Sequence, residues 1–144
     1  MKVLITGAAT AQAYQLQRHL DNTTAIVLAD SAELPQLPGS VQFQKIPAAT
    51  SPSFAHLLLT ICLDLDIQTI YPLRKNEIRA LAESRQLFDE YGITVLVPQK
   101  QLIENLLSKG FKGRIVINDK DNEMPRGIFT TDDSGKEFQL FTAD

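Results

Sequence analysis

The residues of this sequence that could hold a ligand lie in two short segments and at one isolated acid. The first segment surrounds Gly7, and the second is the basic loop that follows Pro72. The acid, Asp30, follows a buried apolar run about twenty residues beyond the glycine. A glycine turn with open backbone amides, faced by an arginine and a lysine, is suited to bind a small anion. The candidate binding residues are Thr6, Gly7, Ala8, Ala9, Thr10, Asp30, Arg74, Lys75 and Asn76.

These segments meet only if the chain folds into a parallel sheet, and the start of the chain indicates that it does. The apolar run Val3–Ile5 is too short for a helix and is typical of a strand covered on both faces. Gly7 ends this strand, and a helical pattern follows over Ala11–Leu20. A strand that passes through one glycine into a helix is the first half of a βαβ unit, so the next strand returns parallel. Further strands are predicted at Ala25–Ala29, Val41–Ile46, Ile67–Tyr71 and Ile93–Val97.

Helices are predicted between these strands. One ends near Leu65, one is capped by Asn76 and ends at Gly92, and a short one covers Gln99–Leu107. Strands that alternate with helices predict the α/β class, here a Rossmann-like open parallel five-stranded sheet in the order 3-2-1-4-5, flanked by helices. Ligands bind outside the carboxyl ends of the strands where this order reverses. We therefore expect the Gly7 segment and the segment after Pro72 to line one crevice, with Asp30 at its end.

The last part of the chain has a different pattern. Three short apolar runs, at Ile115–Asn118, Gly127–Thr130 and Phe138–Thr142, are separated by turn-rich loops and predict a small antiparallel β unit. We expect residues 1–109 to form the Rossmann-like domain and residues 110–144 to form a β-hairpin or meander packed on the same domain. A net charge of −3 without a basic stripe excludes nucleic acid as an expected partner.

Catalytic and metal-binding groups are not predicted. Cys62, the only cysteine, lies in an apolar helical run and is expected to be a buried thiol without a disulfide partner. His19 and His56 have no companion at ligand spacing, and no triad or carboxylate pair is recognisable. No apolar run approaches the length of a membrane span and no leader pattern opens the chain, so we expect a cytoplasmic protein that does not enter a membrane.

The glycine turn keeps only part of the dinucleotide-binding pattern G-x-G-x-x-G. Gly7 supplies the first glycine, but Ala9 adds a methyl group where the backbone should approach a pyrophosphate, and Gln12 replaces the third glycine. An NAD(P)- or nucleotide-binding protein, oxidoreductase-like or a sensor, therefore stays open as the alternative function. The sequence names no particular cofactor.

Several segments together resemble a known family. They are Val3–Gly7, Leu28–Asp30, Ile67–Pro72, Asn76–Glu77, Leu81–Pro98 and Ile103–Lys109. In this combination they resemble the preATP-grasp domain of ATP-grasp proteins related to the carbamoyl-phosphate synthase large subunit. In that family the domain is a Rossmann-like platform that helps to bind the ligated substrate and packs against a larger ATP-grasp module. Lys109 aligns with the lysine at which that module usually begins.

The resemblance implies a small-ligand-binding or subunit-interaction module. Residues 110–144 look nothing like the nucleotide-clamping strands and magnesium carboxylates of the family, so no activity is expected of this chain alone. As part of an enzyme it would serve an ATP-grasp carboxylate-amine ligase. The expected partners are a separate ATP-grasp protein or a second copy of the chain, with a small anion as ligand. A weaker hypothesis has residues 110–144 recruit a partner ligase by strand addition.

Overall fold

The structure, a computed structural model, describes residues 1–33, 42–107, 113–132, 134 and 137–144. Most of the segment between the predicted strands Ala25–Ala29 and Val41–Ile46 lies outside the described residues. So do Val41, at the start of a predicted strand, and the expected domain boundary between residues 109 and 110.

The larger sheet has five parallel strands in the order β3-β2-β1-β4-β5. The central strand is β1, where Val3 pairs with Ile26 on one side and with Thr69 on the other. This arrangement confirms the predicted fold class and strand order. The strands are β1 (Lys2–Ile5), β2 (Ala25–Asp30), β3 (Gln42–Lys45), β4 (Thr69–Tyr71) and β5 (Thr94–Val95).

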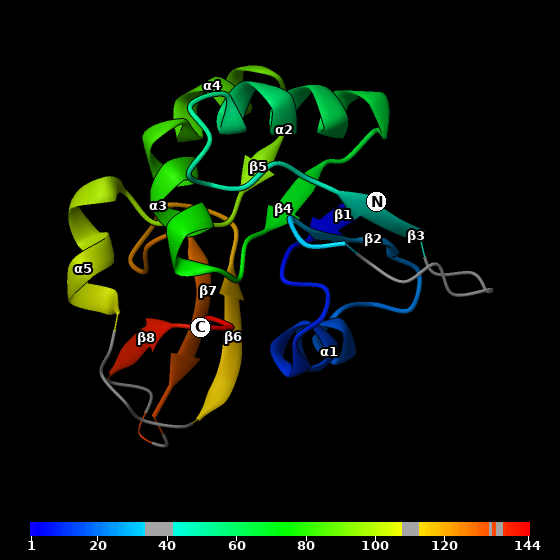
Figure 1. Cartoon of the computed structure of the whole chain (residues 1–144). Coiled ribbons are helices and arrows are strands. Elements are labelled where there is room, and N and C mark those ends of the chain that lie inside the picture. The colour runs from blue at the N-terminus through cyan, green and yellow to red at the C-terminus, as the bar shows by residue number, and fades with distance from the viewer. Residues whose placement is uncertain (34–41, 108–112, 133, 135–136) are drawn as a thin grey trace.

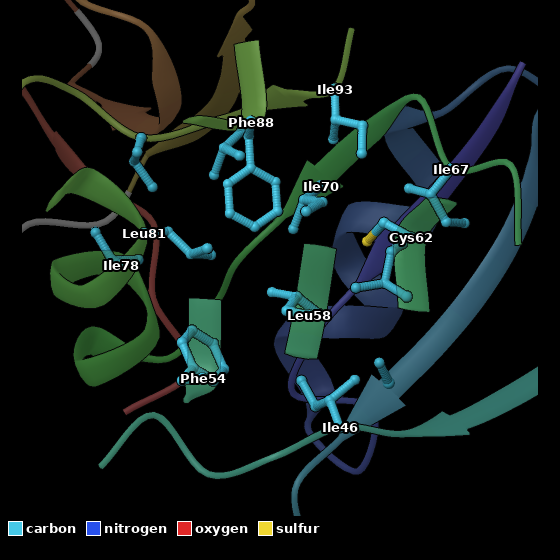
Figure 2. Packing of buried hydrophobic residues seen from close by; sticks show 14 of the residues in the cluster. Ile46, Phe54, Leu58, Cys62, Ile67, Ile70, Ile78, Leu81, Phe88 and Ile93 are labelled. Carbon is cyan, nitrogen blue, oxygen red and sulfur yellow. The ribbon is translucent and has the colours of Figure 1, made fainter. Parts of the chain in front are cut away.

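Helices cover both faces of this sheet. In Figure 1, α2, α3 and α4 lie on one face and α1 lies on the other. Figure 2 shows the apolar layer under the first group, where Phe54 and Leu58 of α2 pack with Phe88 of α4 and Ile70 of β4. The helical elements are α1 (Ala11–His19), α2 (Phe54–Asp64), α3 (Lys75–Glu83), α4 (Arg85–Glu90), the 3₁₀ turn η1 (Lys100–Leu102) and α5 (Ile103–Leu106).

The last part of the chain forms the predicted antiparallel unit. Its strands are β6 (Arg114–Asn118), β7 (Gly127–Thr131) and β8 (Phe138–Leu140), in the order β6-β7-β8. The larger sheet has a buried apolar cluster on each face, one under α2 and one under α1. Two neighbouring residues of β7 belong to different clusters: Phe129 packs in the cluster under α2, and Ile128 packs in the cluster under α1. None of the described helices is long and apolar enough to cross a membrane.

The predicted helix from Asn76 to Gly92 is wrong in two details. It is two helices, because Ser84 leaves the helical conformation at φ −107° and ψ 10°. Serine favours such breaks, since its hydroxyl competes for backbone hydrogen bonds. The N-cap is Arg74 rather than Asn76, whose side chain instead accepts a hydrogen bond from Arg79 at 3.3 Å. The predicted end at Gly92 is confirmed, with φ at +76°.

Candidate functional site

The glycine turn sits at the carboxyl end of β1, against the loop that follows β4. Gly7 has a φ of +66°, and a Cβ at this position would lie 3.5 Å from the Cβ of Leu73. The Oγ1 of Thr6 accepts a hydrogen bond from the Leu73 amide at 2.8 Å and ties the two segments together. The structure thus places the Gly7 turn beside residues 73–75, at the point where the strand order reverses.

Backbone amides in this turn are largely used within the protein. The Ala8 amide donates to the Ala29 carbonyl at 3.1 Å, and the Thr10 amide donates to the Gly7 carbonyl at 2.9 Å. The Thr10 hydroxyl also donates to the Gly7 carbonyl at 2.7 Å and accepts from the Ala13 amide at the start of α1. Fewer donors therefore face a ligand than an open glycine loop would present.

Two of the candidate residues, Asp30 and Arg74, pair with each other. Arg74 Nη2 donates to Asp30 Oδ2 at 2.8 Å, and its Nε donates to Oδ1 at 3.3 Å. Asp30 is buried, with 1% of its side chain exposed, while Arg74 is 30% exposed. Burial works to raise the pKa of Asp30, but the hydrogen bonds and charge of Arg74, with the amides of Ser31 and Ala32, leave that pKa below its ordinary value. The guanidinium of Arg74 is therefore held by the acid that the sequence placed at the end of the predicted crevice.

A carboxylate already lies at the start of α3. Asp144 Oδ1 accepts a hydrogen bond from the Lys75 amide at 2.9 Å, and the Ala143 amide donates to the Leu73 carbonyl at 2.6 Å. Helix starts favour negative charge because their amides are unpaired and the helix dipole is positive there. The chain thus supplies its own anion at the place where the sequence predicts an anion site. No spacing in the sequence links Asp144 to Lys75, so this residue was missed.

A second acid, Glu77, is buried in the first turn of α3, where it interacts with Thr6 and Arg74. Its exposed fraction is 2%, and among the described residues its Oε1 has no hydrogen-bond partner. Burial raises the pKa of Glu77, and a hydrogen bond from Thr6 and the charge of Arg74 only partly oppose this rise. Glu77 follows Asn76, the predicted N-cap, and is not among the predicted site residues. Its position four residues before the buried Leu81 was the signal that could have indicated burial.

The remaining candidates contribute less. The Asn76 side chain is exposed and bonded to Arg79, and Ala9 is exposed at the tip of the turn. The predicted buried thiol of Cys62 is confirmed, and burial raises its pKa to about 12. Within the described residues, no group of three or more histidine, cysteine or acidic side chains could hold a metal ion.

Glu77→Gln tests the buried acid. Folding disfavours the ionised form of Glu77. Its carboxyl therefore costs no folding free energy below its ordinary pKa of 4.5, and the cost grows as the pH rises toward the higher pKa of the folded chain. We expect the stability of Glu77→Gln relative to the parent to increase between pH 4 and pH 8, as measured by urea denaturation. The exposed Glu90→Gln is the matched control and should show no such trend. If the difference in unfolding free energy between Glu77→Gln and the parent did not change with pH, Glu77 would not be a buried carboxyl that lacks a compensating partner.

A five-stranded parallel sheet in the order β3-β2-β1-β4-β5, with helices on both faces, defines a Rossmann-like domain, and the comparison with known families narrows that class. Residues 3–96 match the PylC-like N-terminal domain, so the chain belongs to this family of preATP-grasp domains of ATP-grasp-related proteins. The 144 residues contain no ATP-grasp module. This membership confirms the predicted resemblance to a preATP-grasp domain, whereas the relation to the carbamoyl-phosphate synthase large subunit stays a prediction.

No curated protein matches the chain. Among solved structures, it is similar to one titled "Mutated Uronate Dehydrogenase", with 19% sequence identity and a TM-score of 0.48. The match covers 87% of this chain and 46% of that chain, so this chain spans about half the length of that structure. A likeness this distant carries no argument about function.

Proposed function

We propose that this chain is a non-catalytic preATP-grasp domain whose crevice beside the Gly7 turn binds a small carboxylate-bearing ligand. The observation that carries the proposal is the Asp144 carboxylate on the Lys75 amide at 2.9 Å. The same contact is open to the carboxylate of a small molecule if residues 143–144 move aside. The family supports this ligand class, because an ATP-grasp carboxylate-amine ligase acts on a carboxylate.

The surroundings of the Lys75 amide suit such a ligand. The start of α3 favours an anion through its dipole, and the positive charge of Arg74 lies beside it. Arg74 is fixed by Asp30 in a bidentate ion pair, so its position does not depend on the ligand. In this proposal Arg74 therefore attracts the ligand through its positive charge and does not form a bidentate hydrogen bond with it.

The proposed partner is an ATP-grasp module from outside these 144 residues, as a separate ligase chain. Membership of a preATP-grasp family supports this, since the domain in such proteins packs against that module. Self-association is the second partner hypothesis. Light scattering of the purified chain, alone and with a candidate ligase, distinguishes the two.

The alternative function, that of an NAD(P)- or nucleotide-binding protein, has less support than the binding of a small carboxylate. In the dinucleotide fingerprint an acid at the place of Asp30 binds the ribose hydroxyls. Here both oxygens of Asp30 accept hydrogen bonds from Arg74, and the Ala8 and Thr10 amides donate to protein carbonyls. A dinucleotide would have to break these bonds before it made its own.

Asp144→Ala tests the proposed ligand site. A side chain that caps a helix stabilises it by about 1 kcal/mol, so removing this competitor should strengthen ligand binding about fivefold. The measurement is a titration of the isotope-labelled chain with propionate, followed at the Lys75 amide signal. Asp144→Asn keeps an oxygen acceptor and should fall between the parent and the alanine variant.

Asp64→Ala is the matched control, because it removes another exposed acid, which lies at the end of α2. It should bind propionate as the parent does. Equal affinity of the Asp144→Ala variant and the parent, or a propionate response that spares the Lys75 and Gly7 signals, would rule out this crevice as the carboxylate site.

A further inference from the structure

A cavity lies between α1 and the small antiparallel sheet, on the face of the larger sheet opposite α2. Its volume is about 700 Å³, and its walls come from α1, β6, β7 and the segment that runs from β8 to Thr142. Figure 1 shows α1 beside the β6 edge of that sheet. A cavity of this size is within the range that holds a small molecule. No pattern in the sequence predicts this cavity.

The charged side chains on this cavity are all basic or imidazole groups. Arg18 and His19 come from the last turn of α1, and Arg114 comes from the start of β6. Among the described residues, no aspartate or glutamate lines the cavity. This is unusual for a chain with a net charge of −3, and it makes the cavity a local region of positive potential.

The arginines of the chain divide into two groups by their partners. The four that lie away from this cavity each form an ion pair with an acid: they are Arg74, Arg79, Arg85 and Arg126. Arg18 and Arg114 form none within the part of the chain that the structure describes, and both line the cavity. Both guanidinium groups therefore keep their donors for a ligand, and an arginine fork matches the oxygens of a phosphate.

Favourable charge at a helix end explains only part of this arrangement. Basic residues in the last turn of α1 complement its dipole, which accounts for Arg18 and His19 without a ligand. It does not account for Arg114, which belongs to a strand of the other sheet and faces the same cavity. The walls also carry the amides of Gln12 and Gln15 and the apolar side chain of Phe141, so a ligand with polar and apolar parts fits them.

We propose that this cavity binds a small molecule that carries a phosphate group, with Arg18 and Arg114 as the phosphate-binding residues. The inference is independent of the proposed carboxylate crevice, because the two sites use different residues. They meet only in the last segment of the chain, where Thr142 lines the cavity and Asp144 reaches the start of α3.

The test is a titration of the isotope-labelled chain with glycerol 3-phosphate, with inorganic phosphate and malonate as comparison probes. We expect saturable shifts of the Arg18, His19 and Arg114 amide signals, with glycerol 3-phosphate bound more tightly than malonate. The double variant Arg18→Gln/Arg114→Gln should bind at least about tenfold more weakly, because it removes charge-assisted hydrogen bonds from both arginines to the phosphate.

The control is Arg79→Gln/Lys100→Gln, which removes the same charge from two exposed ion pairs elsewhere and should bind as the parent does. If the double variant does not fold, the exposed Arg114→Gln alone provides the same comparison. Equal affinity of variant and parent, tighter binding of malonate, an absence of saturable shifts, or shifts confined to the Lys75 crevice would each overturn the proposal.

Discussion

Replacing Arg74 with methionine is expected to lower the free energy of unfolding by about 3 kcal/mol at pH 7. The reason is that Asp30 is only 1% exposed and would lose the charge that compensates its own. For a chain of this size, the midpoint of thermal unfolding should fall by roughly 10 °C. Arg79→Met, which breaks an ion pair between exposed side chains, is the control and should cost less than about 1 kcal/mol.

The effect of Arg74→Met should depend on pH. Because Arg74 holds the pKa of Asp30 below its ordinary value of 3.8, the pair contributes stability above that value. The contribution is lost as the pH falls through the lower folded value. The parent and the variant should therefore converge in acid, and Asp30→Asn/Arg74→Met should recover most of the loss at pH 7. An Arg74→Met variant as stable as the parent at pH 7 would show that Asp30 does not need its partner.

Phe129→Ala is expected to have an effect of similar size, about 3–5 kcal/mol. Phe129 is fully buried in the apolar layer that contains Phe88 and Leu58, and its ring meets Phe138 edge to face with centroids 5.1 Å apart. The loss should appear in urea denaturation followed both by circular dichroism and by the amide signals of β6 and β7. Tyr91→Ala, at a side chain that is 55% exposed, is the control and should change stability little.

This second prediction also tests the expected domain organisation. If residues 110–144 pack on the same core as residues 1–109, both probes should report one cooperative transition in the parent and in Phe129→Ala. A separate, earlier transition of β6 and β7 would contradict that prediction. If Phe129→Ala lowered the free energy of unfolding by less than about 1 kcal/mol, this would also contradict the prediction. Phe129 would then not hold residues 110–144 against residues 1–109.

The sequence was sufficient to predict the parallel sheet and its strand order. Buried parallel strands are short apolar runs, and Val3–Ile5 shows this pattern. The segment Ile67–Tyr71 has apolar or aromatic residues at three of its five positions and is stopped by Pro72. Once the strand order is known, the segments that follow the first and fourth strands must meet at one edge. The location of the Gly7 turn next to Leu73 and Arg74 could therefore be anticipated from these runs.

The contacts inside the crevice could not be anticipated in the same way. Asp30 and Arg74 are 44 positions apart, and whether their side chains pair or face a ligand depends on how the loop after β4 is bent. The contact of Asp144 with α3 depends on the path of the whole last segment. The cavity beside α1 likewise forms between α1 and β6, two elements that share no local pattern. Such features arise from tertiary packing, which periodicity does not encode.

The most direct test of the proposed function is a crystal structure of Asp144→Ala grown with propionate. We expect the propionate carboxylate to accept a hydrogen bond from the Lys75 amide, with Arg74 still paired to Asp30. A propionate bound only elsewhere on the molecule, with the start of α3 in contact with solvent alone, would contradict the account of this crevice as a carboxylate site.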